Sequence, residues 1–278
     1  MARLESLPQL EDLSIGFSIP IPRPSVESLL LGKQGTPVML SNLKSLSFRG
    51  VSAYLERLIS QIRAPVLRVL SITLFNQLAF TLTHLSQFVN ITEQIKFPHT
   101  ATIAFLPGDF ITLSHHAMMP RAPPSQGFTL HVMCKPLDWQ IDCAAQICTA
   151  LMSALSGVER LTLFKISGYS LATSDSETNE TDYTTYDPTW PELLRSFVSV
   201  KELYIDPDFI VELSRALEVD ERGLDPELLP NLQGLASDSP GIMDAESLFG
   251  SFLHARQVAG RPVSWRPPSP PLSPGLPS

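Results

Sequence analysis

Apolar residues follow the same short pattern at six places along the chain. Each copy has an apolar residue, two variable residues, an apolar residue, one variable residue and a last apolar residue. The copies begin at Leu10, Leu43, Leu67, Val158, Val200 and Leu232, and the sixth lacks its last apolar residue. The second half of each copy alternates with the period of a half-buried strand. The pattern predicts strands with one buried face and one open face.

Stretches with apolar residues three or four positions apart, the spacing of amphipathic helices, lie between these copies. The stripes run from Tyr54 to Ile62, from Leu78 to Val89, from Ile141 to Leu155, from Leu193 to Phe197, from Phe209 to Leu217 and from Leu248 to Leu253. Gly157 and Gly260 stand where two of the helices should end. A chain that alternates strand and helix predicts parallel strands whose buried face the helices cover.

Two less regular segments, centred on Ile103 and Leu130, also alternate and complete a set of about eight strands. Ile95–Phe97 is the alternative to Ile103 for the fourth strand, and Phe110–Ser114 is expected to form an extra hairpin strand. The spacing between strands is irregular and mostly longer than the 20–29 residues of regular leucine-rich repeats. The predicted fold class is therefore α/β, an irregular leucine-rich-repeat-like solenoid with about eight mostly parallel strands on one face and helices on the other.

Composition divides the chain further. Residues 1–260 are expected to form the repeat domain, with a polar, acidic and flexible loop at 172–189. Residues 261–278 contain seven prolines and are expected to form a Pro-rich disordered tail. The tail offers a polyproline or proline-directed phosphorylation motif, although disordered tails acquire such motifs readily.

Charge and cysteine content bear on partners and compartment. The formal net charge is −8, and the chain has no dense basic stretch, so neither nucleic acid nor an anionic membrane is an expected partner. Three cysteines, Cys134, Cys143 and Cys148, are too few and too uneven for a secreted disulfide framework. With no signal peptide and no apolar run of membrane-spanning length in the sequence, the expectation is an intracellular protein, cytoplasmic or nuclear, with reduced thiols.

Candidate chemistry is sparse. His131 and the three cysteines lack the paired spacing of structural zinc, and Cys148 lies in an apolar helical stripe. No nucleophile elbow, Walker motif or dinucleotide fingerprint occurs in the sequence. Trp139 and Trp190 are expected to pack in the core at helix starts. We therefore expect no metal, no cofactor and no enzyme activity; an enzyme of unrecognised type on an irregular α/β fold is the alternative.

The order of several motifs resembles the repeat region of the F-box and leucine-rich-repeat-like proteins of mushroom-forming fungi. The resemblance spans roughly residues 7–263 and is carried by these segments: Leu137–Gln140, Val158–Leu161, Trp190–Leu194, Val200–Leu203, Leu228–Leu232 and Gly260–Val263. It implies the substrate-recognition half of an F-box ubiquitin-ligase adaptor. The F-box that normally precedes the repeats has no counterpart here. A Skp-type adaptor is therefore an expected partner only if an upstream F-box exists, and the reading frame is either truncated or a stand-alone repeat module.

The open face of the predicted sheet is the candidate binding surface for an unknown protein partner. Residues between the last two apolar positions should point outward, in order Ser14, Ser47, Ser71, Ala104, His131, Thr162, Tyr204 and Ala236. The second half of the face adds Phe164 and Asp206. Aromatic side chains concentrate binding energy at interfaces. The candidate protein-binding residues are Ser47, Ser71, His131, Thr162, Phe164, Tyr204 and Asp206.

The first strand lies close to the start of the sequence, with little chain before it to cover its edge. Stacked repeats need a cap at each end because their interior is otherwise exposed. We therefore expect apolar surface around Leu4, Leu7, Leu10 and Leu13, and a tendency to associate with itself.

Overall fold

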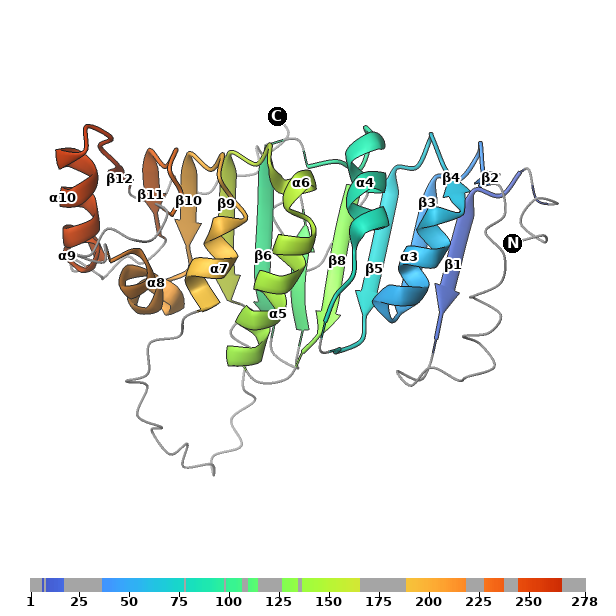
Figure 1. Ribbon diagram of the computed structural model, residues 1–278, viewed down its shortest axis with the longest axis horizontal. Helices are drawn as coiled ribbons and strands as arrows, with labels where there is room; N and C mark the ends of the chain where they lie inside the picture. Colours follow the sequence, from blue (N-terminus) through green and yellow to red (C-terminus); the bar gives the residue numbers. More distant parts are fainter. Residues whose placement is uncertain are drawn as a thin grey trace, which may run out of the picture.

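The computed structural model describes residues 7, 9–17, 37–77, 79–97, 99–106, 110–114, 127–134, 137–165, 189–218, 228–237 and 245–266. Within them, ten strands form one open, mostly parallel sheet. The helices lie along one face of this sheet, so the architecture is mixed α/β with two layers (Figure 1).

The ten strands are ordered across the sheet from the N-terminal to the C-terminal part of the chain, except in the middle. In spatial order they are β1 (Asp12–Gly16), β3 (Ser45–Gly50), β5 (Val69–Leu74), β8 (Gly127–Met133), β7 (Phe110–Ser114), β6 (Thr100–Leu106), β9 (Arg160–Lys165), β10 (Glu202–Ile205), β11 (Gly234–Ala236) and β12 (Ser264–Arg266). A separate small sheet pairs β2 (Val38–Met39) with β4 (Ile62–Arg63) in parallel.

The repeated apolar pattern has one structural cause. In each copy the first apolar residue donates its backbone N–H to the carbonyl three residues earlier, as Leu43 does to Leu40 and Val200 does to Phe197. In four of the copies the carbonyl of the following residue accepts two N–H groups from the next strand, as Lys44 does from Arg68 and Val69. This turn directs the first and the last apolar residue of a copy toward the core. Backbone hydrogen bonds meanwhile continue from one strand to the next.

The centre of the sheet departs from the expected order. The strand centred on Leu130, β8, lies beside β5, and the earlier strand β6 lies beside β9. The predicted hairpin strand Phe110–Ser114 forms β7, which is antiparallel to both and stands between them. Since β7 returns from β6 toward β5, the next strand β8 takes the vacant edge beside β5. Ile95–Phe97, the alternative fourth strand, lies in no strand.

The helices follow the predicted stripes with shifted bounds. They are α3 (Ser52–Ser60), α4 (Thr83–Ile91), α5 (Leu137–Ala150), α6 (Met152–Leu155), α7 (Thr189–Arg195), the 3₁₀ turn η1 (Pro207–Phe209) with α8 (Ile210–Leu217), α9 (Ala245–Leu248) and α10 (Gly250–Val258). Gly260 adopts φ +73°, the left-handed conformation that favours glycine after a helix. The stripe that ends at Ile62 stops earlier, because Ile62 belongs to β4.

One helix is capped by another helix rather than by its own sequence. Leu82, at the N-cap of α4, has no side chain that could accept a hydrogen bond. Glu56 of α3 supplies both acceptors instead: its carboxylate accepts the N–H of His84 at 2.7 Å and that of Leu85 at 2.8 Å. Glu56 is buried, so this contact fixes α4 against α3 in a part of the core from which water is excluded.

The core lies between the sheet and the helices. Leu46, Leu70, Leu161 and Leu203 are buried as predicted, each no more than 1% exposed. Trp190, at the start of α7, is also a core residue, as expected. Its ring lies 5.3 Å from that of Phe209 and 6.1 Å from that of Phe105, centroid to centroid. This aromatic cluster joins β6 to α7 and to the turn before α8.

The first residues of the predicted tail are ordered. Ser264–Arg266 forms the edge strand β12, parallel to β11, instead of belonging to a disordered segment. Trp265 explains the difference: its ring stacks on Phe249 with centroids 5.9 Å apart, so the strand gains a hydrophobic anchor. Residues 267–278 and nearly all of the predicted acidic loop lie outside the described residues, and Thr189 is the first residue of α7.

The cysteines also depart from the expectation of three reduced thiols. Cys134, just after β8, and Cys143, in α5, form a disulfide, whereas Cys148 is free and buried. The sequence spacing gave no sign of this pair, because it is the packing of α5 against the end of β8 that brings the two residues together.

Candidate protein-binding face

The face of the sheet opposite the helices carries a continuous row of hydroxyl groups. Strand register places one hydroxyl side chain on each of eight neighbouring strands. In spatial order the row is Ser14, Ser47, Ser71, Thr129, Ser114, Thr102, Thr162 and Tyr204. Strands lie about 4.8 Å apart, so the row presents hydroxyls at that interval across the sheet.

The observed row contains Thr129 and Thr102 where the sequence predicted His131 and Ala104, each of which lies two residues later in the same strand. Leu70 pairs with Phe128 rather than with Leu130, and Leu161 pairs with Ala101 rather than with Ile103. His131 and Ala104 consequently belong to the next row along the strands. A shift of two residues keeps a side chain on the same face, so only the position within the face changes.

Ala104 was expected to face solvent, and it is completely buried. Its partners in register are Thr112 on one side and Phe164 on the other. Side chains of register partners lie beside each other on one face, so the large Phe164 ring flanks the Ala104 methyl group.

Accessibility divides the face into two patches separated by a buried centre. Thr102, Ser114 and Thr129, on the three central strands, are only 4%, 5% and 7% exposed. Ser47 and Thr162, in the same row on outer strands, are half-buried, and Ser14 is exposed. The predicted single binding surface is therefore two smaller ones.

The first surface, which we call the hydroxyl patch, consists of Ser14, Ser47, Ser71 and Thr73 on β1, β3 and β5. These side chains are short, so the patch is flat and carries hydroxyl donors and acceptors without a large anchor. Arg49 borders it and is exposed, with its guanidinium 5.7 Å from the centroid of the Phe75 ring. The hydroxyl patch contains Ser47 and Ser71 of the predicted site.

The second surface, which we call the aromatic patch, consists of Thr162 and Phe164 on β9 and Tyr204 on β10. Thr162 and Tyr204 are partners in register, and Phe164 lies two residues farther along its strand. All three are half-buried and alternate along their strands with the buried Leu161, Leu163 and Leu203, so they lie on the face that the helices leave open. Diagonal neighbours across two strands lie within reach of aromatic side chains, so Phe164 and Tyr204 are placed to act together in one contact surface.

Asp206, predicted to extend this surface, serves the fold instead. It is 9% exposed and caps η1: one carboxylate oxygen accepts the N–H of Asp208 at 3.1 Å. The other oxygen accepts the N–H of Lys165 at 3.1 Å, at the end of β9. Both carboxylate oxygens accept backbone N–H groups, so Asp206 connects β9 to β10. We therefore do not count it among the residues that would contact a partner.

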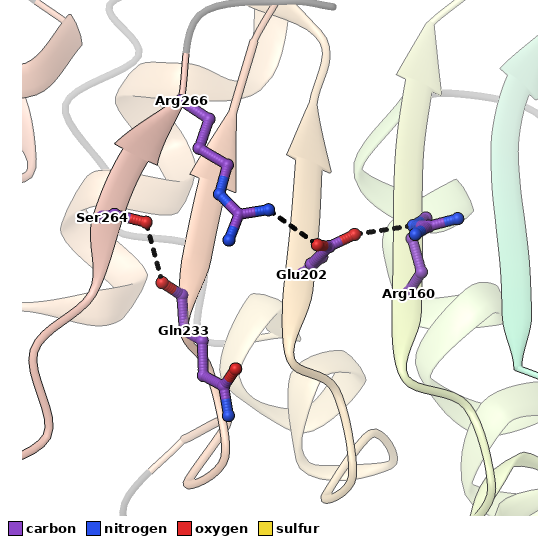
Figure 2. A network of polar contacts seen from close by, with 5 residues as sticks. All are labelled: Arg160, Glu202, Gln233, Ser264 and Arg266. Carbon is purple, nitrogen blue, oxygen red and sulfur yellow. Dashed lines mark hydrogen bonds and ion pairs between the residues drawn. The ribbon is translucent and has the colours of Figure 1, made fainter.

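A network of charges, the charge clamp, borders the aromatic patch. The Glu202 carboxylate accepts from Arg160 at 2.7 Å and from Arg266 at 2.8 Å, which ties β9, β10 and β12 together across the open face (Figure 2). Arg266 reaches Glu202 by passing over β11 at Gly234. A Cβ on Gly234 would lie 3.4 Å from the Arg266 Nε, so a longer side chain there would displace the guanidinium.

The two guanidinium groups alter the acidity of Glu202. Hydrogen bonding from Arg160, together with the positive charges of Arg160 and Arg266, holds the pKa of the Glu202 carboxyl below its ordinary value. Glu159, the residue before the first residue of β9, also has a lowered pKa, because Lys201 donates a hydrogen bond to its carboxylate at 2.8 Å. The border of the aromatic patch therefore stays ionised at neutral pH.

His131 lies at the edge of the buried centre rather than in either patch. Its Nδ1 and the Thr112 hydroxyl oxygen are 2.7 Å apart and share a hydrogen bond. Burial lowers the pKa of His131, because desolvation disfavours the imidazolium. A neutral imidazole held by a buried threonine is a structural contact, so His131 is a weaker candidate for partner binding than Phe164 or Tyr204.

Two features of the described ranges bear on metal binding and on buried thiol chemistry. No three side chains among His, Cys, Asp and Glu there are grouped so that they could hold a metal ion. A small cavity beneath β6, β7 and β8 is lined by aliphatic side chains and by Cys148. Burial raises the pKa of the Cys148 thiol, so the group lining this cavity is a protonated thiol rather than a nucleophilic thiolate.

Comparison with known proteins identifies no relative: no protein-family model, no curated protein and no solved structure matches the chain. Among the helices of the described ranges, none has both the length and the apolar character that a bilayer crossing requires.

Proposed function

We propose that this protein is a non-enzymatic scaffold that binds another protein through the open face of its sheet, with the aromatic patch as the principal contact. The observation that carries the proposal is the strand register that sets Thr162, Phe164 and Tyr204 together on the helix-free face. Half-buried aromatic side chains on rigid strands lose little conformational entropy on binding, which is why such residues dominate interface energies.

The surroundings of the aromatic patch support this role. The charge clamp holds β9, β10 and β12 in fixed register, so the patch is preorganised before a partner arrives. The hydroxyl patch supplies a second, flatter surface with short polar side chains, suited to hydrogen bonds with a partner's backbone. The turn repeated before six of the strands also supports a solenoid of the leucine-rich-repeat type, which uses its open sheet for recognition.

The resemblance to F-box proteins extends the proposal to a class of partner. On that basis the bound protein is a substrate of a ubiquitin ligase, and the setting is intracellular. A Skp-type adaptor would join only through an F-box, so its recruitment is a separate question from binding at the aromatic patch. The two can be measured separately.

The test is affinity capture from cell extract with the full chain and matched variants, with and without added Skp-type adaptor. Tyr204→Ala and Phe164→Ala remove the anchors of the aromatic patch. Val211→Ala is the control, because Val211 is an exposed apolar residue on α8, away from the sheet face. We expect the anchor variants to lose about 2 kcal/mol of binding free energy or more and the control to bind as the wild type does.

A second pair of variants probes the face without altering aromatic packing. Ser71→Arg places a long cation in the hydroxyl patch, and Gln146→Arg places the same group on exposed α5. If a partner binds equally to all these folded variants, the open face is not its binding site and the proposal is wrong. Capture that depends on the added adaptor alone would support only the F-box resemblance.

A further inference from the structure

The two outer edges of the ten-stranded sheet are matched to each other. We propose that copies of this chain associate head to tail, the β12 edge of one copy pairing in parallel with the β1 edge of the next and extending the sheet. This inference concerns the edges and does not depend on what the open face binds.

Both edges have backbone groups available for such pairing. Glu11 C=O and Phe17 N–H point from β1 toward β3. Because backbone groups alternate along a strand, those of Asp12, Ser14 and Gly16 point away from the sheet. At the other edge, Ser264 N–H points to β11, so the groups of Val263 and Trp265 point outward. Within the described residues, β1 pairs only with β3 and β12 only with β11.

The polarity and register of the edges agree. All strands of the sheet other than β7 are parallel, so a new junction between β12 and β1 would also be parallel. Within the sheet, Ser264 and Asp12 occupy the same position relative to the repeated turn. Continuing the ladder sets Ser264 opposite Asp12, Trp265 opposite Leu13 and Arg266 opposite Ser14 of the next copy.

Apolar surface remains at both ends in that same register. The core position is filled by Leu46, Leu70, Leu203 and Leu235 in interior strands, where each is no more than 1% exposed. At the two edges the position is filled by Leu13 and Trp265, and both are half-buried. Leu7, next to β1, is 47% exposed. Head-to-tail pairing would place Leu13 against Trp265 and complete the burial of both.

The edges are also complementary in charge. Residues 9–17 contain Glu11 and Asp12 and no basic residue, whereas residues 250–266 contain no acidic residue and three arginines, of which Arg256 is buried in its own chain. Asp12 is exposed and would lie one strand away from Arg266 of the preceding copy, whose guanidinium also pairs with Glu202 of its own chain. Opposite charges favour this pairing over contact between two identical edges. Because the interface joins two different surfaces, repetition produces an open-ended row of copies rather than a closed dimer.

The first test is sedimentation of the full chain over a range of concentrations. Head-to-tail association predicts an average mass that keeps rising with concentration, without a plateau at two copies, and that falls as salt is added. A chain that stays monomeric throughout the range would overturn the proposal, and so would a salt-insensitive dimer.

Edge variants then test the geometry. Ser14→Pro removes an outward N–H from β1, and Ser14→Ala keeps it, so only the proline variant should lower the association constant, by about tenfold or more. Trp265→Pro and Trp265→Phe form the corresponding pair at β12, because phenylalanine keeps both the outward N–H and an aromatic ring. Circular dichroism and thermal unfolding establish that each variant is folded. A mixture of the two proline variants retains one competent edge of each kind and should stop at a 1:1 dimer.

Register is tested by cross-linking under a mild thiol oxidant. Ser264→Cys in one copy and Asp12→Cys in another should form a disulfide between chains, because these positions become partners. Ser264→Cys with Gly16→Cys, four residues out of register, should not. Equal cross-linking of both pairs would show that the association is not this extension of the sheet.

Discussion

The two ends of the sheet, β1 to β5 and β9 to β12, repeat one backbone arrangement with different chemistry on the open face. Both contain the same turn, before β1, β3 and β5 in the first and before β9, β10 and β11 in the second, and both place a Glu–Lys pair at the same register position. Glu11 and Lys44 are 2.8 Å apart in the first, and Glu159 and Lys201 are 2.8 Å apart in the second. Beyond this shared frame, the first end adds short hydroxyl side chains and the second adds aromatic rings and the charge clamp.

The comparison separates what holds the fold from what distinguishes its surfaces. Buried apolar positions and the backbone ladder are common to both ends, so they account for the shared architecture. The open face differs because its side chains are not needed for packing. Recognition is therefore expected where the face departs most from its repeated background, which is the aromatic patch.

Cavity variants at equivalent core positions test whether the two ends form one cooperative unit, and they should have the largest effect. Leu70→Ala and Leu161→Ala each leave a hole in the buried layer and should lower the free energy of unfolding by about 2–5 kcal/mol. Urea unfolding followed by circular dichroism should show one transition, shifted similarly in both. Two separate transitions, each moved by only one variant, would divide the sheet into independent parts.

Helix capping provides the next test, because the capping carboxylate comes from a different part of the fold at each end of the sheet. In the first end, Glu56→Ala removes the acceptor of two backbone N–H groups at the start of α4 and should cost about 1–3 kcal/mol of stability. Amide exchange should rise at His84 and Leu85. Arg57→Ala, on the neighbouring position of α3, is the control and should leave that exchange unchanged.

At the second end the capping residue, Asp206, immediately precedes the turn that it caps. Asp206→Ala removes the acceptor for Asp208 N–H and Lys165 N–H and should cost about 0.5–2 kcal/mol. Asp208→Ala retains the backbone N–H and removes only an exposed ion pair with Lys165, so it should cost less. Equal losses in thermal unfolding would mean that the cap does not stabilise this junction.

The charge clamp should have a smaller effect that is confined to the second end. Its groups are well exposed, so Glu202→Gln should cost only about 0.2–1 kcal/mol, and amide exchange should rise in β12. Glu11→Gln, which removes a single ion pair at the first end, should leave β12 unaffected. Faster exchange at β12 in both variants would contradict a local clamp.

The same variant has a defined pH dependence. The pKa of Glu202 is lowered in the folded protein, so its contribution is complete above the unfolded value of about 4.3. The contribution is lost as the pH falls through the lower folded value. The difference in stability between wild type and Glu202→Gln should therefore persist at neutral pH and shrink in acid.

Titration of His131, between the two patches, should have the smallest effect. Its pKa is lowered in the folded state, so the unfolded chain takes up the proton first as the pH falls below about 6.5. Stability should decline from there until the folded value is reached. His131→Asn should flatten that part of the profile; an unchanged profile would place the pH dependence elsewhere.

Much of the architecture was predictable because it depends on local spacing. The apolar pattern identified β1, β3, β5, β9, β10 and β11, and the burial of Leu46 and Leu161 follows from strand alternation. The hairpin strand and the core role of Trp190 were also correct. Among the candidate site residues, Ser47, Ser71, Thr162, Phe164 and Tyr204 lie on the open face, since side-chain direction in a strand alternates residue by residue.

What the sequence by itself determined is the repeated unit: an apolar frame that turns the chain, forms a strand and buries one face. Only the tertiary structure decided how the units join. The antiparallel β7 reversed the order of the central strands, and burial of Thr102 and Thr129 divided the face into two patches. The tertiary structure also made Asp206 a helix-capping residue instead of part of the open face, and it joined Cys134 to Cys143. Such contacts depend on which distant segments become neighbours, and short-range periodicity carries no information about that choice.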